Sequence, residues 1–387
     1  CGCAKCQTQT TIGANQTVMT DLYCSMIHGG LMLTLKTPQP QAQHCCLRKD
    51  GFKINLNENF WNNFAFESLR ETNLKNLWDS GCSNCQRLEQ SGQISMRQGM
   101  NQGLEIAPQT KLSGPARIDL MFDISCNLAC RTCGPNSSTY WQKHLQENQL
   151  WTQPIFSPRS VDKVISALGN LDLSNLRQLV FCGGETLLGN SYWEVAKWLA
   201  SNYDTSQVTL CFQTNGTQPL PASMFDVIKK FHLVRLQISL DGIDSRFEYL
   251  RWPAEWPQVV ENLMTIREQA PSNVMFLIEE TVSIFNLFYL QELEHWAKKD
   301  FFDNREGDVV NHTRHLAHGA FALARCSQEY VNAIQSTPYA SLIPGDFKEN
   351  YYGIVSMMDN IKKFDLLRGQ SFEQTFPEVA EFYARYL

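Results

Sequence analysis

The stretch "ARIDLMFDISCNLACRTCGP", residues 116–135, joins an apolar β-type run to three closely spaced cysteines. Cys126, Cys130 and Cys133 stand at i, i+4 and i+7, so in a loop that leaves a strand their thiolates can converge on one centre. A structural zinc site normally takes four ligands. A cubane iron–sulfur cluster held by only three thiolates keeps one iron open to an outside ligand. We therefore expect a cluster with an open iron here, with zinc and a plain electron-transfer cluster as the alternatives.

The same run begins a regular alternation of strands and helices. Further β-type runs lie at 177–182, 207–213, 233–240 and 273–283. Between them, apolar residues recur at a spacing near 3.6 in segments 160–171, 191–203, 222–231 and 256–269. This alternation predicts an α/β fold with a parallel sheet, either open or curved into a partial or full barrel. In each case the reactive groups are expected at the carboxyl ends of the strands.

The chain divides into three regions by composition and pattern. Residues 1–115 lack the alternation and are rich in Gln, Asn and Cys, so we expect a separate cysteine-rich module there. Residues 116–310 are assigned to the barrel, although the pattern weakens past residue 300, where the sequence is polar and loop-like. Residues 311–387 contain helical segments near 321–336 and 346–365 and are expected to form an extension that covers the barrel.

Composition narrows the class of protein. The chain has 387 residues, 14 cysteines and a formal net charge of −6. This acidic charge argues against a protein that binds mainly to a nucleic-acid backbone, because such binding needs clustered Lys and Arg. No run of about 18 apolar residues is present, so no membrane span is expected. The grouping of the cysteines is typical of metal ligation in a reducing cytoplasm, which is where we expect the protein to act.

At the three-cysteine loop the chain resembles the radical S-adenosylmethionine (radical SAM) enzymes. Their signature is CxxxCxxC just after the first strand of a partial (β/α)6 barrel. Similar motifs follow at successive strand ends in the family's order: "FCGGET" (181–186), "QTNGT" (213–217) and "ISLDG" (238–242). The resemblance implies a TIM-like partial barrel, a [4Fe–4S] cluster on the three cysteines and S-adenosylmethionine bound at its open iron.

The resemblance assigns roles to the residues of the first two motifs. Gly183, Gly184 and Glu185 match the family's GGE motif and would meet the methionine amino group. Thr214 and Asn215, which end the third strand, would face the cofactor.

Further roles follow from the fourth strand onward. The resemblance places Ser239 and Asp241 near the ribose and the methionyl carboxylate. Arg251 matches an arginine that would pair with that carboxylate. One position departs from the pattern: the residue before Cys133 is often an aromatic that packs on the adenine, and here it is Thr132. The adenine contact is therefore left unassigned.

A second group of cysteines lies upstream. Cys82 and Cys85 form a CxxC pair, and Cys24 with one of Cys45 or Cys46 completes four ligands; we favour Cys45. A site closed by four thiolates stores charge or stabilises the fold, since no corner is open to substrate. Four thiolates suit both zinc and a [4Fe–4S] cluster, and we expect the cluster.

This upstream region resembles the half-SPASM, or twitch, modules that carry an auxiliary cluster in radical enzymes that modify peptides. The matching features are the Cys45-Cys46 pair, the W-x-S-x-C-x-x-C stretch at 78–85 and S-x-R-Q at 95–98. The group's C-terminal "R-G" and "F-P-E" are matched at 368–369 and 376–378. The first three cysteines of the chain leave two alternatives, a second auxiliary cluster shared with Cys46 or unligated thiols: Cys1, Cys3 and Cys6.

Other reactive residues have simpler interpretations. Cys182 and Cys211 lie in apolar strands and are expected in the core, although Cys182 directly precedes the GGE motif. Cys326 is either a buried structural thiol, which we favour, or a hydrogen-atom donor. The three histidines of "NHTRHLAHG" are interpreted as surface or substrate-contact residues rather than a ligand set: His312, His315 and His318.

The sequence thus predicts an enzyme. The resemblance implies reductive cleavage of S-adenosylmethionine to a 5′-deoxyadenosyl radical, which takes hydrogen from a substrate C–H, with flavodoxin or ferredoxin as reductase. The favoured substrate is a ribosomally synthesised peptide that is crosslinked, epimerised or changed in its backbone. The alternatives are a small molecule or a hypermodified (phage) nucleobase, and a non-enzymatic iron–sulfur electron-transfer protein.

Overall fold

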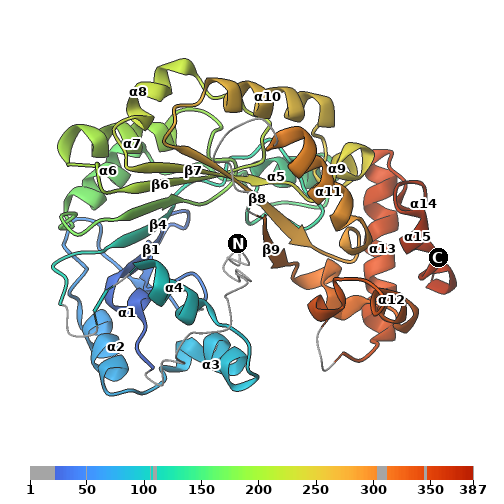
Figure 1. Cartoon of the computed structure of the whole chain (residues 1–387), viewed down its shortest axis with the longest axis horizontal. Helices are drawn as coiled ribbons and strands as arrows, with labels where there is room; N and C mark the ends of the chain where they lie inside the picture. Colours follow the sequence, from blue (N-terminus) through green and yellow to red (C-terminus); the bar gives the residue numbers. More distant parts are fainter. Residues whose placement is uncertain are drawn as a thin grey trace.

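The computed structural model describes residues 22–48, 50–104, 106–107, 111–302, 312–343 and 347–386. Its centre is a nine-stranded sheet in the order β3-β2-β1-β4-β5-β6-β7-β8-β9 (Figure 1). The strands are β1 (Gly30–Thr34), β2 (Gln41–Gln43), β3 (Phe52–Lys53), β4 (Arg117–Met121), β5 (Gln178–Phe181), β6 (Thr209–Thr214), β7 (Leu233–Ser239), β8 (Val274–Val282) and β9 (His312–Leu316). Strands β1 and β4 to β9 run parallel, whereas β2 and β3 are antiparallel additions beside β1.

Strands β4 to β9 form the predicted α/β partial barrel. The connecting helices α6 (Val161–Gly169), α7 (Ser191–Asn202), α8 (Phe225–Ile228) and α10 (Trp256–Gln269) cover the convex face of the arched sheet (Figure 1). The buried strand residues that meet these helices make one continuous apolar core: Leu120, Phe181, Phe212, Leu236 and Phe276. The five strands and four helical segments predicted from periodicity are confirmed.

The sequence led us to expect a separate N-terminal module, but this region is joined to the barrel sheet. Strand β1 pairs in parallel with β4, so that Leu31 lies opposite Ile118, and β2 and β3 extend the sheet beyond it. The strand is short, and its pairing partner lies more than 80 residues away, so no local pattern reveals it. The helices of this region lie below the sheet in Figure 1: α1 (Ser25–Gly29), α2 (Phe64–Leu74), η1 (Ser80–Cys82), α3 (Ser83–Gln90) and α4 (Met96–Leu104).

The sixth barrel strand, β9, is a second difference. It lies in a region interpreted as loop and within the part assigned to the C-terminal extension, yet it pairs with β8, with His315 opposite Thr281. The polar sequence of this strand hides it, because a strand whose neighbours supply the apolar contacts need not be apolar itself. In the described part of the chain, no helix is both long and apolar enough to cross a membrane.

The C-terminal helices form a second apolar core beside the end of β8. Its buried members include Phe285, Tyr330, Ile354, Phe376 and Tyr383. The helices of this part are α12 (Gln328–Ile334), α13 (Tyr351–Arg368), α14 (Phe372–Thr375) and α15 (Pro377–Glu381). The remaining helices are α5 (Thr139–Glu147), α9 (Asp244–Leu250), α11 (Leu290–Trp296) and the short turns η2 (Ala222–Met224), η3 (Leu287–Tyr289), η4 (Ala297–Phe301), η5 (Gly319–Phe321), η6 (Leu323–Arg325), η7 (Ala340–Leu342) and η8 (Ala384–Tyr386).

Candidate functional site

A cavity of about 420 Å³ opens at the carboxyl ends of the parallel strands. This volume lies in the range of small-molecule and cofactor sites. Ten of the residues assigned to the cluster and cofactor line it: Cys126, Cys130, Cys133, Gly183, Gly184, Glu185, Thr214, Asn215, Ser239 and Arg251. Four motifs spread over 126 residues of sequence thus meet in one place.

Hydrogen bonds to its backbone groups hold the three-cysteine loop in place. The Ala129 N–H donates to the Trp252 carbonyl at 2.7 Å, and the Trp141 indole N–H donates to the Cys130 carbonyl at 2.9 Å. Burial raises the pKa of the Cys130 thiol to about 12 and raises that of Cys126 as well. These thiols are therefore protonated at neutral pH unless a metal displaces the protons.

The two glycines of the GGE motif permit close approach to this loop. Gly183 has a φ of 151°, and a Cβ atom added there would lie 2.1 Å from the Asp123 carbonyl oxygen. A Cβ atom on Gly184 would lie 2.2 Å from the Ser125 carbonyl oxygen. Only glycine allows the end of β5 to run against the start of the cysteine loop, which leaves its backbone facing the cavity.

Glu185 ties the ends of β5 and β6 together. Its carboxylate accepts hydrogen bonds from the Thr214 hydroxyl at 2.7 Å, the Asn215 N–H at 2.6 Å and the Leu187 N–H at 2.9 Å. The side chain is 2% exposed and lines the cavity. These bonds orient a carboxylate at the cavity wall, where its negative charge suits a ligand amino group.

Asp241 does not line the cavity, in contrast to the position that the resemblance implies. It lies behind Arg251, with its Oδ2 2.8 Å from the Arg251 Nη2, and its Oδ1 accepts the Thr281 N–H at 2.8 Å. Burial lowers the pKa of Arg251, but the charges of Asp241 and Cys130 outweigh it, and the net shift is upward. Arg251 thus stays positively charged in the cavity wall, and Asp241 holds it there.

The cavity also contains residues that sequence reasoning did not assign. Gln213, Thr281, Ala317 and His318 line it, as does Cys182, while Thr132 occupies the position of the expected aromatic residue. Thr281 lies near the end of a predicted strand, so the expectation that reactive groups lie at strand ends could have identified it. His318 follows β9, which the sequence did not reveal.

The remaining candidates lie elsewhere. His315 is buried in β9 whereas His318 is exposed at the cavity, so these two do not form a ligand set. The side chain of His312 lies outside the described part of the chain. Cys326 is buried in the C-terminal core, where the prediction of a structural thiol placed it. Cys211 is likewise buried in the barrel.

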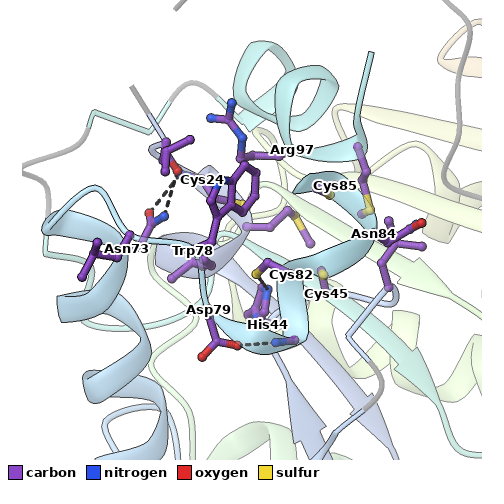
Figure 2. A pocket seen from close by; sticks show the side chains of 17 residues that line it. Cys24, His44, Cys45, Asn73, Trp78, Asp79, Cys82, Asn84, Cys85 and Arg97 are labelled. Atoms are coloured by element: carbon purple, nitrogen blue, oxygen red, sulfur yellow. Dashed lines mark hydrogen bonds between the residues drawn. The ribbon is translucent and has the colours of Figure 1, made fainter. Parts of the chain in front are cut away.

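A second pocket gathers the four upstream cysteines. Cys24, Cys45, Cys82 and Cys85 line it together with His44, and Figure 2 shows them around a common space. Burial is the main cause that raises the pKa of each of these thiols, to about 12 for Cys24 and about 11 for Cys82. The four come from three segments distant in sequence: the start of α1, the loop after β2, and η1 with α3.

A buried ion pair braces this pocket. Arg97 makes a two-pronged contact with Glu89, with Nε–Oε1 and Nη2–Oε2 distances of 2.9 and 2.7 Å. Its Nη1 donates to the Tyr23 carbonyl at 2.6 Å, next to Cys24, and Ser95 donates to Glu89 at 2.5 Å. The S-x-R-Q stretch therefore locks α4 to α3 and to the segment that carries Cys24.

The adjacent cysteines 45 and 46 differ in their surroundings. Cys45 lines the four-thiol pocket, whereas Cys46 is not among its lining residues. Cys46 lies between two buried clusters, one that contains Cys24 and Cys45 and one that contains Met32, Met121 and Cys182. No three or more His, Cys, Asp or Glu side chains within the described ranges are gathered closely enough to hold a single metal ion. The alternative that involves Cys1, Cys3 and Cys6 falls outside the described residues.

A parallel partial barrel whose strand-end cavity is lined by three cysteines and a GGE turn is the arrangement that the resemblance to radical SAM proteins implies. Residues 124–285 match the model of the radical SAM superfamily, so this part of the chain is a radical SAM domain. No curated protein matches the chain.

Among solved structures, the chain is similar to structures of two proteins. One is anSMEcpe with bound AdoMet, with 16% identity and a TM-score of 0.37, over 65% of this chain and 62% of that chain. Another is SuiB of Streptococcus suis bound to S-adenosylmethionine, with 13% identity and a TM-score of 0.36, over 82% and 64%. SuiB bound to the precursor peptide SuiA matches at 12% identity and a TM-score of 0.36, over 77% and 64%. The chain spans about three fifths of the length of these proteins.

Proposed function

We propose that this enzyme holds a [4Fe–4S] cluster on Cys126, Cys130 and Cys133, binds S-adenosylmethionine at it, and uses the resulting 5′-deoxyadenosyl radical to take hydrogen from a substrate C–H. The observation that carries the proposal is the convergence of these three thiols with Glu185 and Arg251 in one strand-end cavity. When bound, the cluster and its cofactor supply the electron and the radical. The protein supplies binding, orientation and exclusion of water.

The residues of the cavity suit the two ends of a methionine moiety. Arg251 offers a buried cation for a carboxylate, and its ion pair with Asp241 fixes the direction of its guanidinium. Glu185 offers an acceptor for an ammonium group, held in place by Thr214 and Asn215. The glycine backbone of the GGE turn leaves room for the ligand between these two groups.

We further propose that Cys24, Cys45, Cys82 and Cys85 hold an auxiliary [4Fe–4S] cluster. In a cubane each thiolate binds a different iron, so the ligands stand around a wider centre than a single zinc ion needs. The resemblance of this region to twitch modules, which carry an auxiliary cluster, favours the cluster over zinc. A closed four-thiolate cluster would relay an electron or orient the substrate.

For the substrate we propose a ribosomally synthesised peptide. The support is the resemblance to twitch modules of peptide-modifying enzymes, whose W-x-S-x-C-x-x-C and S-x-R-Q stretches build the four-thiol pocket and its Arg97 brace. A flavodoxin or ferredoxin is the proposed electron donor.

Anaerobic reconstitution with counting of iron and sulfide tests the proposal. Wild-type protein should bind about eight irons per chain and, once reduced, should form 5′-deoxyadenosine from S-adenosylmethionine. Replacing Cys126, Cys130 and Cys133 by Ala should remove about four irons and all cleavage. Cleavage that survives this replacement would refute the assignment.

The auxiliary site has a matched control in the neighbouring cysteine. Cys45→Ala should lose about four irons, whereas Cys46→Ala should keep all eight, because Cys45 lines the pocket and Cys46 does not. Bound zinc in place of these four irons would contradict the auxiliary cluster while leaving the barrel cluster intact. Incubation with candidate precursor peptides, followed by mass spectrometry, tests the substrate class.

A further inference from the structure

Arg368, the last residue of α13, is a half-buried residue whose guanidinium nitrogens are shielded from solvent. Its Cζ lies 4.5 Å from the ring centre of Trp141, 4.8 Å from that of Trp252 and 5.1 Å from that of Phe364. Its Nε, Nη1 and Nη2 are all shielded from solvent, and none of them has a hydrogen-bond partner among the described residues. The aromatic faces therefore make a box around a guanidinium whose N–H groups are unused.

Such an arrangement is unfavourable in the protein alone. A buried cation that lacks an anionic partner loses hydration, and stacking on aromatic rings offsets only part of that cost. A second cation, Arg131, lies close to it: burial and then Arg131 lower the pKa of Arg368 to about 9. Arg131 forms an ion pair with Asp365, which also raises the pKa of Arg368 but makes no hydrogen bond with it. The box thus leaves the N–H groups of Arg368 free to donate to a negatively charged group beside it.

The box adjoins the three-cysteine loop. Two of its rings belong to residues that bond the loop backbone, through the Trp141 indole N–H to the Cys130 carbonyl and the Ala129 N–H to the Trp252 carbonyl. The charge of Arg368 also acts on the Cys130 thiol, whose pKa it lowers against the larger effect of burial. Arg368 is not among the residues that line the cofactor cavity. It therefore approaches the loop from a side other than the one proposed for S-adenosylmethionine.

We propose that Arg368 is a positioning residue for the barrel cluster: its N–H groups donate to sulfur at the Cys130 corner, and its charge raises the reduction potential of the cluster. The inference rests on the proposed function, since it requires a cluster on Cys126, Cys130 and Cys133. A [4Fe–4S]²⁺ core with three thiolates is already an anion, and one-electron reduction adds a further negative charge. A buried cation nearby stabilises the reduced state more than the oxidised state. This gives the C-terminal R-G pair a role that packing alone does not explain.

The test is the midpoint potential of the reconstituted full-length enzyme. Arg368→Met, Arg368→Lys and wild type are titrated with reductant and followed by electron paramagnetic resonance, where the barrel cluster is identified by its response to added S-adenosylmethionine. Lys363→Met is the matched control, because Lys363 lies on the same helix with its Nζ 5.9 Å from the Phe364 ring centre but is solvent-exposed.

Arg368→Met should lower the equilibrium constant for reduction at least tenfold, which corresponds to about 59 mV for a one-electron couple. The midpoint potential of Arg368→Lys should lie between those of Arg368→Met and wild type, and that of Lys363→Met should match wild type. Iron content and the Kd for S-adenosylmethionine should stay unchanged in all three. The inference is overturned if the equilibrium constant for reduction of Arg368→Met, at full iron content, lies within twofold of the wild-type value.

A second measurement covers the case in which Arg368→Met does not assemble its cluster. In protein stripped of iron, removal of an unpaired buried cation should leave Tm unchanged or raise it, whereas loss of a structural arginine should lower it. In the iron-stripped proteins, a Tm of Arg368→Met below that of Lys363→Met overturns the inference. Failure of the proposed function is a different result: wild type itself would then bind no iron at the barrel or form no 5′-deoxyadenosine.

Discussion

The ion pair between Asp241 and Arg251 gives the sharpest prediction for stability. Asp241 is 1% exposed and Arg251 7%, so Asp241→Asn leaves a buried arginine without its counter-charge. Removal of one partner of a buried pair costs about 3–5 kcal/mol. Asparagine keeps the size of the side chain and an oxygen for the Thr281 N–H, so nearly all of this loss is electrostatic. We expect the free energy of unfolding to fall by about 3–5 kcal/mol.

Urea unfolding of the cluster-free protein at pH 7 measures this loss. The control is Asp226→Asn, whose ion pair with Lys229 at 3.5 Å is solvent-exposed and should contribute under about 1 kcal/mol. The double variant Asp241→Asn/Arg251→Met should be more stable than Asp241→Asn alone, since it removes the uncompensated charge. In reconstituted enzyme, Asp241→Asn should also weaken binding of S-adenosylmethionine. A loss below about 1 kcal/mol, or a double variant no more stable than the single one, would refute the reasoning.

Three further predictions follow from other parts of the structure. In urea unfolding, Gly184→Ala should lower the free energy of unfolding by about 1–3 kcal/mol, because the added Cβ meets a backbone carbonyl. The control Gly103→Ala, whose Cβ meets nothing within 4 Å, should be neutral or stabilising by up to about 1 kcal/mol. Equal effects of the two substitutions would contradict this reasoning. Arg97→Met should cost about 3–5 kcal/mol because it leaves the Glu89 carboxylate without its cation; a loss as small as that of an exposed pair would count against the brace. Burial lowers the pKa of His144, so the contribution of this residue to stability should be full above about pH 6.5 and be lost as the pH drops below it. Urea unfolding at pH 7 and pH 5 should therefore show a smaller fall in the free energy of unfolding for His144→Phe than for wild type. An equal fall would exclude this cause.

Most of the barrel was predictable from local pattern. Apolar runs of strand length alternate with helical periodicity from residue 116 to residue 283, and both signals depend only on residues close in the chain. Strands β1 and β9 were missed for the opposite reason. Each is five residues long and is stabilised by pairing with β4 or β8, and that pairing is not encoded within the segment itself.

The candidate sites divide in the same way. The sequence alone determined which residue types stand at each strand end, and therefore that thiols, glycines, a carboxylate and an arginine would meet at one edge of a parallel sheet. That inference needs only strand order, because the carboxyl ends of parallel strands share an edge.

Tertiary structure decided which way the individual side chains face. It places Cys45 rather than Cys46 in the four-thiol pocket, Asp241 behind Arg251 rather than in the cavity, and Arg368 beside the cysteine loop from a helix more than 200 residues away. Neighbouring residues of a turn point in different directions, and packing against elements distant in sequence selects among them. No local pattern carries that choice.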